Sequence, residues 1–349
     1  MALATDGSVS SLATLGVTAK DVPAVRRRIA DLESKLSDVR PAVGSATDRA
    51  RLARKQKQLR AALVELAAAD AALALVNEDH AQAVDSARVC LKHSVELYGE
   101  GAVQLVPAYS LLASAHLGIG KAHEAEELLA TANWAVVRAG EDAPPAERSR
   151  VARGFGRLNA ARGDLERAAQ SFAEAAYEVA LATGPESVDA AHIYFELGVV
   201  FDRMAGDGDA DGPAASPGAS ASPATAKALA CFDKAVSCWY RALQHARGDA
   251  AGRPNSQIAP WAVMAEGSAV VSSVAQACAA RLGPRHTAVH EAHFTLGLLE
   301  WARGNLAQAA ELCAAAAEGF REASGEDCDA ALDAAAALAA VQEEARMQA

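Results

Sequence analysis

The sequence has few aromatic residues, and none of its cysteines falls in a C-x-x-C pair. Only 5% of the residues are Phe, Trp or Tyr, while 51% are hydrophobic, largely because of alanine. Sheets favour β-branched and aromatic side chains, whereas alanine lets helices approach closely, so this composition predicts an all-α fold. The scattered cysteines, six in all, indicate free thiols in a reducing, intracellular compartment.

Motifs of catalysis and of membrane insertion are also missing. The sequence holds no G-x-x-x-x-G-K-[ST], G-x-S-x-G or H-E-x-x-H motif, and the glycines of RGFGRLNAARG fit helix packing and a turn. We therefore expect no enzyme activity, no catalytic residue and no cofactor. Because no secretory segment and no uninterrupted apolar run of about 18 residues is present, we also expect no membrane span.

Charge is distributed unevenly along the chain. The net charge is −11, yet residues 20–60 contain twelve Lys and Arg against five Asp and Glu, which leaves −18 on the remainder. A globally acidic chain is a poor general ligand for nucleic acid, so we expect no such partner. The basic segment forms either a solvated face or a contact with an acidic partner. The candidate contact residues are Arg26, Arg27, Arg28, Arg54, Lys55 and Lys57.

The basic segment, residues 20–63, is predicted to be a helical hairpin that caps the rest of the chain. Residues 1–19 precede it and are predicted to be disordered. Apolar residues at three and four residue spacing then indicate an amphipathic helix, which Pro41 and Gly44 end. A longer helical run with basic early turns, DRARLARKQKQLRAALVELAAADAALALV, follows. The apolar residues of the first helix are Val25, Ile29, Leu32, Leu36 and Val39.

Residues 64–204 repeat with a period of about 42 residues. The clearest helix-turn-helix unit is 108–138, with Gly120 at the turn and Ala125, Leu129 and Ala132 on one face of the second helix. Successive units are separated by 42, 43 and 42 residues, which predicts a superhelix of tetratricopeptide repeats in their longer, kinesin-light-chain form. The units start at Val64, Val106, Ser149 and Ala191.

The repeat departs from its pattern at three places. In the first unit, Asp70 occupies a position where the other units have a small or apolar residue. In the fourth unit the second helix begins 18 residues late, and residues 205–226 are a Gly, Pro, Ser and Asp tract that predicts a disordered insertion. Residues 227–349 are then predicted to hold degenerate and C-terminal repeats and an end helix.

Two patterns resemble metal sites, but each has a more ordinary interpretation. Residues 207–212 spell D-x-D-x-D-G, the opening of a calcium loop, yet Gly218 stands where the closing Glu belongs. His286, His290 and His293 have helical spacing, but His286 is predicted to precede the helix, so these are interpreted as joint and groove histidines. We expect no metal site.

Tryptophan is sparse and spread through the repeats. The four tryptophans are interpreted as packing anchors. The alternative is that one or two of them face the concave groove and bind a partner. Tyr109 and Trp134 are the candidate binding residues of this kind. The four are Trp134, Trp239, Trp261 and Trp301.

Residues 91–137 carry a more specific pattern. This segment resembles the tetratricopeptide-repeat proteins of the motile axoneme, the family of the animal zinc finger MYND domain-containing protein twelve, and weaker similarity covers residues 64–340. The family's zinc finger does not carry over, because residues 1–60 contain no cysteine. The matching residues are Leu97-Tyr98-Gly99, Gln104-Leu105-Val106-Pro107-Ala108-Tyr109, Leu117-Gly118-Ile119-Gly120, Ala125-Glu126-Glu127 and Trp134.

The resemblance implies a non-enzymatic scaffold that is made in the cytoplasm and works in the axoneme of a cilium or flagellum. Similar proteins of flagellated algae are subunits of inner-arm dynein d, so this chain is expected to dock or stabilise a single-headed inner-arm dynein on the doublet microtubule. The implied partners are the dynein heavy chain, a second axonemal tetratricopeptide protein, and tubulin or other doublet-associated proteins. The alternative is a cytosolic dynein-arm assembly factor or a kinesin-light-chain-like cargo adaptor.

Overall fold

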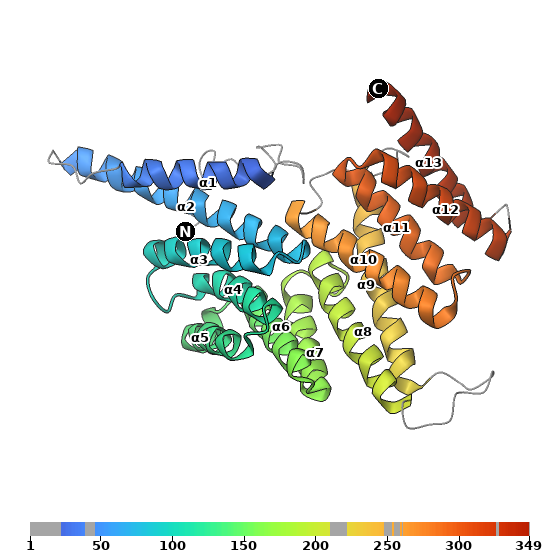
Figure 1. Cartoon of the computed structure of the whole chain (residues 1–349), viewed down its shortest axis with the longest axis horizontal. Coiled ribbons are helices and arrows are strands. Elements are labelled where there is room, and N and C mark those ends of the chain that lie inside the picture. The colour runs from blue at the N-terminus through green and yellow to red at the C-terminus, as the bar shows by residue number, and fades with distance from the viewer. Residues whose placement is uncertain are drawn as a thin grey trace. The chain divides into compact units, whose positions relative to one another are not determined.

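Helices make up all the regular secondary structure of the described residues. The computed structural model describes residues 22–38, 46–209, 222–247, 253–254, 259, 261–325 and 328–348. No strand occurs within these ranges, which confirms the predicted all-α fold (Figure 1). The predicted disorder of residues 1–19 and positions 210–221 of the predicted insertion lie outside the described residues.

The chain divides into two units, of which the N-terminal unit is Met1–Ala143 with Pro260–Ala262. Turns of a few residues join α2 to α3 and α4 to α5, so each pair forms an antiparallel helical hairpin. Two short 3-10 helices, Val103–Leu105 and Gly140–Asp142, precede α4 and follow α5. The helices are α1 (Val22–Ser37), α2 (Ala46–Val76), α3 (His80–Tyr98), α4 (Val106–Gly118) and α5 (Ala122–Ala139).

The first two helices pack through one apolar face. Val25 and Leu32 of α1 are buried against Leu63 and Leu66 of α2, in the pattern that the spacing of apolar residues predicts. Helix α2 runs unbroken for 31 residues because no Gly or Pro interrupts it. The predicted boundary between the basic segment and the first repeat therefore lies inside one helix.

The C-terminal unit is Pro144–Ala259 with Val263–Ala349. Helices α6 and α7, α8 and α9, and α11 and α12 form hairpins, α13 packs against α12, and α10 lies between the second and third hairpins in chain order. Helix α8 continues four residues past the predicted start of the insertion. The helices are α6 (Pro145–Arg162), α7 (Leu165–Ala182), α8 (Val188–Asp209), α9 (Pro223–Arg247), α10 (Trp261–Leu282), α11 (Thr287–Arg303), α12 (Leu306–Ser324) and α13 (Asp329–Gln348).

In each hairpin of the C-terminal unit, a glycine of the first helix packs against a larger side chain of the second helix. A Cβ on Gly156 of α6 would lie 2.7 Å from the ring of Phe172 in α7, and one on Gly198 of α8 would lie 2.6 Å from Phe232 in α9. The paired positions are 16 residues apart in the first case and 34 in the second. The difference of 18 residues equals the length of the insertion inferred from the sequence.

Helix α10 is the one described helix that is long and apolar enough to cross a membrane. Residues Ala262–Leu282 have a mean hydropathy of 1.2, and half of this stretch is buried inside the protein. Its Glu266 forms an ion pair with Arg153, and its Ser268 donates a hydrogen bond to buried Glu300 at 2.5 Å. The helix therefore packs as a core helix, whose apolar residues contact other helices.

The turn between paired helices requires a left-handed backbone, and the first repeat supplies it without glycine. Gly120, Gly163 and Gly304 have φ of 75°, 83° and 88°, whereas Glu78 at the same place has φ of 59°. A side chain in this left-handed region costs about 1–2 kcal/mol of folding free energy. Glycine has more conformational freedom in the unfolded chain, which offsets part of the gain, so Glu78→Gly is expected to stabilise the protein by about 0.5–1 kcal/mol. The urea midpoint should rise with an unchanged m-value.

The control for this turn is Gly163→Ala, which places a Cβ where the backbone is left-handed. Its urea midpoint should fall by an amount that corresponds to about 1 kcal/mol. A lower midpoint for Glu78→Gly would show instead that the Glu78 side chain makes a contact worth more than the backbone strain.

Candidate protein-binding surfaces

The fold uses Arg26 internally, to satisfy a buried carboxylate. Its Nε lies 3.3 Å from Oδ1 of Asp70, whose side chain is 1% exposed. Asp70 also accepts hydrogen bonds from the Ser86 hydroxyl at 2.5 Å and from the Gln82 amide at 3.1 Å. These donors explain how the first repeat tolerates Asp70 at a packing position, because a buried carboxylate must be paired and hydrogen-bonded.

The other two predicted arginines of α1 make local contacts. Arg27 donates to the backbone oxygen of Pro23 at 3.2 Å. Arg28 and Lys35 both contact the carboxylate of Asp31, at 2.9 and 2.7 Å. The Lys35 hydrogen bond and the two positive charges lower the pKa of the Asp31 carboxyl. The charge of α1 is therefore partly neutralised on the helix itself.

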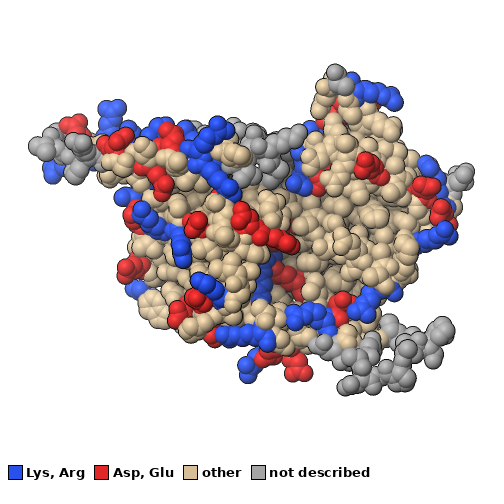
Figure 2. Space-filling model, viewed as in Figure 1, with Lys and Arg blue, Asp and Glu red and all other residues tan. Residues whose placement is uncertain are grey.

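The basic residues of α2 have a different setting, because they are exposed. The predicted candidates Arg54, Lys55 and Lys57 are all exposed to solvent. Arg49 and Arg51 are exposed as well, although they were not among the candidates chosen from the sequence. Within the described residues none of these five forms an ion pair, whereas Arg60 in the next turn contacts Glu96 at 2.8 Å. Figure 2 shows several Lys and Arg side chains on the surface over α1 and α2. We name Arg49, Arg51, Arg54, Lys55 and Lys57 the α2 cation surface.

Trp134 is exposed, unlike the other tryptophans whose side chains are described. Its side chain is 55% exposed on α5, whereas Trp239 and Trp301 are fully buried packing anchors. One edge of the Trp134 ring lies against the backbone at Gly101, and the Arg138 guanidinium sits 5.2 Å from the ring centroid. These contacts fix the ring while leaving its outer face accessible to a partner.

Tyr109, the other aromatic candidate, is half-buried on α4. Burial, together with the nearby carboxylate of Glu100, raises the pKa of its hydroxyl. Tyr109 therefore offers less accessible surface to a partner than Trp134 does, and its hydroxyl stays protonated at neutral pH.

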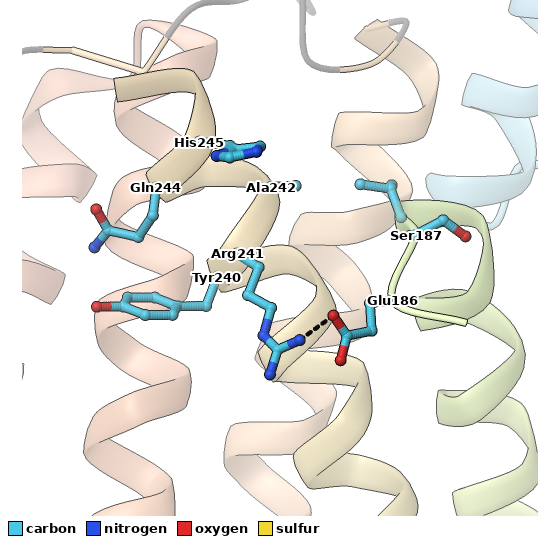
Figure 3. A pocket seen from close by; sticks show the side chains of 8 residues that line it. Glu186, Ser187, Tyr240, Arg241, Ala242, Gln244 and His245 are labelled. Atoms are coloured by element: carbon cyan, nitrogen blue, oxygen red, sulfur yellow. Dashed lines mark ion pairs between the residues drawn. The ribbon is translucent and has the colours of Figure 1, made fainter. Parts of the chain in front are cut away.

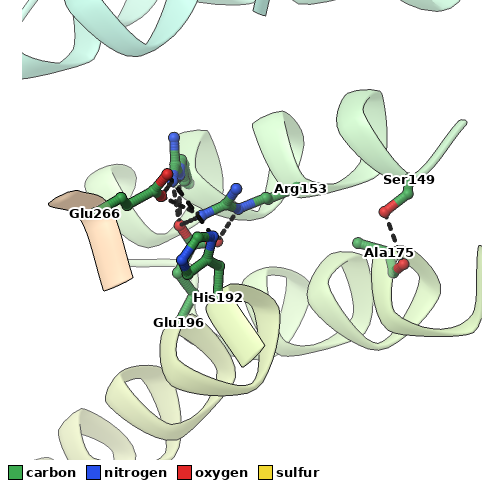
Figure 4. A network of polar contacts seen from close by, with 7 residues as sticks. Ser149, Arg153, Ala175, His192, Glu196 and Glu266 are labelled. Atoms are coloured by element: carbon green, nitrogen blue, oxygen red, sulfur yellow. Dashed lines mark hydrogen bonds and ion pairs between the residues drawn. The ribbon is translucent and has the colours of Figure 1, made fainter. Parts of the chain in front are cut away.

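A charged network in the C-terminal unit was not found from the sequence. Arg153 of α6 donates to both oxygens of Glu196 of α8, at 2.9 and 3.0 Å, and to Glu266 of α10 at 2.8 Å (Figure 4). Arg157 donates to Glu196 at 2.6 Å and lies 3.6 Å from Glu266. His192 Nδ1 lies 3.7 Å from Glu266. We call these five residues the Arg–Glu network.

Two arginines and two carboxylates balance one another in this network. The arginines overcome the effect of burial and lower the pKa of Glu196. For Glu266, burial raises the pKa, but His192 in its protonated form and then the two arginines lower it by more. Burial lowers the pKa of His192 more than Glu266 raises it, so the ring is neutral at pH 7. The side chains of Arg153 and Glu196 are 22% and 15% exposed, so the network mainly ties three helices together.

An open hollow lies between the start of α8 and the end of α9. Its volume is about 700 Å³, and two of its lining residues, Arg241 and Glu186, form an ion pair (Figure 3). Tyr240 and His245 of α9 also line it. The hollow is open to solvent and so lacks the enclosure of a small-molecule pocket.

Thiol and metal chemistry find little support in the described residues. Burial raises the pKa of four thiols to about 11, so these cysteines are poor nucleophiles at neutral pH. His286 caps α11, because its Nδ1 accepts from the Ala288 amide at 3.2 Å, as its predicted place before the helix requires. Within the described ranges no three His, Cys, Asp or Glu residues form a metal site. The four cysteines are Cys90, Cys238, Cys278 and Cys313.

The predicted calcium-like segment lies mostly beyond what the structure describes. Residues 207–209 form the end of α8, but their side chains and residues 210–212 are outside the described residues. The absence of a calcium site at this place stays a prediction.

Comparison with known proteins gives distant structural similarity and no matching family model. The chain is similar to a solved structure described as "Crystal structure of BtubC (BKLC) from P. vanneervenii", with 18% sequence identity and a TM-score of 0.45. The alignment covers 88% of this chain and 94% of that chain. Neither result assigns a function or a partner.

Proposed function

We propose that this chain is a non-enzymatic scaffold subunit of the ciliary or flagellar axoneme, which docks or stabilises a single-headed inner-arm dynein on the doublet microtubule. The observation that carries the proposal is the exposed Trp134, in the segment whose residues resemble the axonemal family. Packing explains the generic positions of that segment, such as Leu112 and Leu129, which are buried. It does not explain a tryptophan that the fold holds at the surface.

The chemistry of Trp134 suits a binding anchor. A large aromatic side chain held by its neighbours loses little conformational freedom on binding, and tryptophan is enriched among the residues that dominate interface energies. Helical repeats also bind partners over broad surfaces without any reaction chemistry. Under this proposal the partners are the dynein heavy chain and a second axonemal tetratricopeptide protein, with tubulin or other doublet-associated proteins as further contacts.

Trp134→Ala is expected to weaken attachment to the axoneme. The chain should be expressed in a flagellate that lacks its own copy, and axonemes should be extracted after removal of the membrane. Loss of an interface anchor should weaken binding on the order of tenfold, about 1.4 kcal/mol, so the variant should leave the axoneme at lower salt than the unchanged chain.

Tyr177→Ala is the matched control. Tyr177 is 64% exposed on α7, at the position 43 residues after Trp134, but it lies outside the segment with the specific resemblance. Its salt release should equal that of the unchanged chain. If the unchanged chain is itself lost with the soluble cytoplasm, the alternative of an assembly factor or cargo adaptor replaces the proposal.

A further inference from the structure

The α2 cation surface holds more positive charge than the fold uses. Residues 46–60 contain six Lys and Arg against one Asp, and no residue of 46–62 is buried. Of the six cations only Arg60 forms an ion pair within the described residues, so the other five lack a carboxylate partner there. By contrast, α1 places Asp31 between Arg28 and Lys35.

The spacing of these cations works against the isolated helix. Arg51 and Lys55 are four residues apart, and Arg54 and Lys57 are three apart, so like charges are neighbours on the helix surface. Each such pair destabilises a helix by about 0.2–0.5 kcal/mol. The helix is nevertheless continuous from Ala46 to Val76, and its later turns pack on α1 and α3. An anion bound along these turns would relieve the repulsion.

The surroundings of the surface select the class of anion. A membrane-binding helix needs a free apolar face, but the apolar face of α2 is already covered by Val25 and Leu32 of α1. Single-stranded nucleic acid binds through aromatic stacking as well as charge, and Ala46–Val76 contains no aromatic residue. The remaining −18 of the chain also repels a long polyanion.

We infer that the α2 cation surface binds an acidic, extended segment of a partner protein. The distance from Arg49 to Lys57 along the helix is about 12 Å at 1.5 Å per residue. About four residues of an extended chain cover that distance at roughly 3.3 Å each. A run of glutamates or aspartates can therefore place successive carboxylates beside several of the five cations. The inference does not involve Trp134 and does not depend on the proposed function.

The test measures binding of a fluorescent glutamate peptide of about ten residues to the full chain. At about 50 mM salt, where exposed charges are weakly screened, fluorescence anisotropy should show binding that weakens steeply as salt rises. The variant Arg54→Glu/Lys55→Glu/Lys57→Glu should bind on the order of tenfold more weakly, because three pairs worth about 0.5 kcal/mol each are lost.

The control variant makes the same number of charge reversals outside the α2 cation surface. It is Lys92→Glu/Lys121→Glu/Arg167→Glu, at exposed positions in α3, in the turn before α5 and in α7. It should bind the peptide within about twofold of the unchanged chain, since none of its three residues belongs to the α2 cation surface. Equal losses in both variants, or no loss in either, would overturn the inference. Tighter binding of an oligothymidine of similar length, or of phosphatidylserine vesicles, would overturn the assignment to a protein segment. Far-UV circular dichroism should show that both variants keep their helices.

Discussion

Arg153→Met should lower the free energy of unfolding by about 2–3 kcal/mol at pH 7, because it removes one of the two guanidinium groups that Glu196 and Glu266 share and leaves only Arg157 beside them. Removing one partner of a fully buried ion pair costs about 3–5 kcal/mol. The value expected here is smaller, since the side chains of Arg153 and Glu196 remain 22% and 15% exposed. Methionine keeps most of the stem volume, so the loss measures charge pairing rather than packing. Urea unfolding at pH 7 gives the measurement.

The pH dependence separates this electrostatic loss from a general packing defect. Charged neighbours lower the pKa of both carboxylates in the folded state: the two arginines act on Glu196, and His192 and then the arginines act on Glu266. Their contribution to stability is therefore complete above the unfolded pKa, about 4.3, and is lost as pH falls toward the lower folded values. The difference between the unchanged chain and Arg153→Met should shrink below about pH 4.3. A difference that stays constant with pH would contradict the electrostatic account.

Arg150→Met on the same helix is the matched control. Arg150 is 46% exposed and contacts Glu147 at 3.2 Å within one turn of α6. Exposed pairs of this kind contribute about 0.2–1 kcal/mol, so the control should change the urea midpoint little. An equal loss in both variants would mean that the cost comes from α6 itself and not from the Arg–Glu network.

The sequence predicted the helices but not this network, and the reason is the separation of its members. Arg153 and Glu196 are 43 residues apart, and Arg153 and Glu266 are 113 apart. Helical periodicity reports which residues share a face of one helix, whereas pairing between helices also depends on how the hairpins pack. The one available signal was Glu266, the single acidic residue of the largely apolar helix α10, because a buried carboxylate needs a partner.

The same limit explains which candidate residues the structure brings together. Charge counting placed Arg26 with Arg54, Lys55 and Lys57 in one basic segment, but Arg26 instead contacts Asp70. The sequence alone could show that Asp70 departs from the repeat pattern and that, if buried, its carboxylate would need hydrogen-bond donors. It could not show the identity of the donor, since Arg26 lies 44 residues earlier on another helix. Exposure of Trp134, likewise, depends on the loop at Gly101.

Gly156→Ala is expected to cost about 2 kcal/mol, although alanine is the better helix former. A Cβ at this position would lie 2.7 Å from the Phe172 ring, which is 2% exposed and cannot move aside without disturbing its neighbours. Overpacking of a core costs about 1–3 kcal/mol, more than the gain of about 1 kcal/mol in helix propensity. Gly206→Ala on α8 is the control, because a Cβ there meets nothing within 4 Å. It should stabilise by about 0.5–1 kcal/mol.

The repeat itself supplies a variant that should reverse the loss. Ala113 and Leu129 occupy, one repeat earlier, the positions of Gly156 and Phe172, and both are buried. The double variant Gly156→Ala/Phe172→Leu therefore recreates a pair that this chain already packs, with the smaller side chain making room for the added methyl group. The loss of stability in the double variant should be about 1–2 kcal/mol smaller than the sum of the losses in the two single variants, because the effects of substitutions at contacting residues are not additive. Additive losses in urea unfolding would show that the alanine clashes with some part of α7 other than the Phe172 ring.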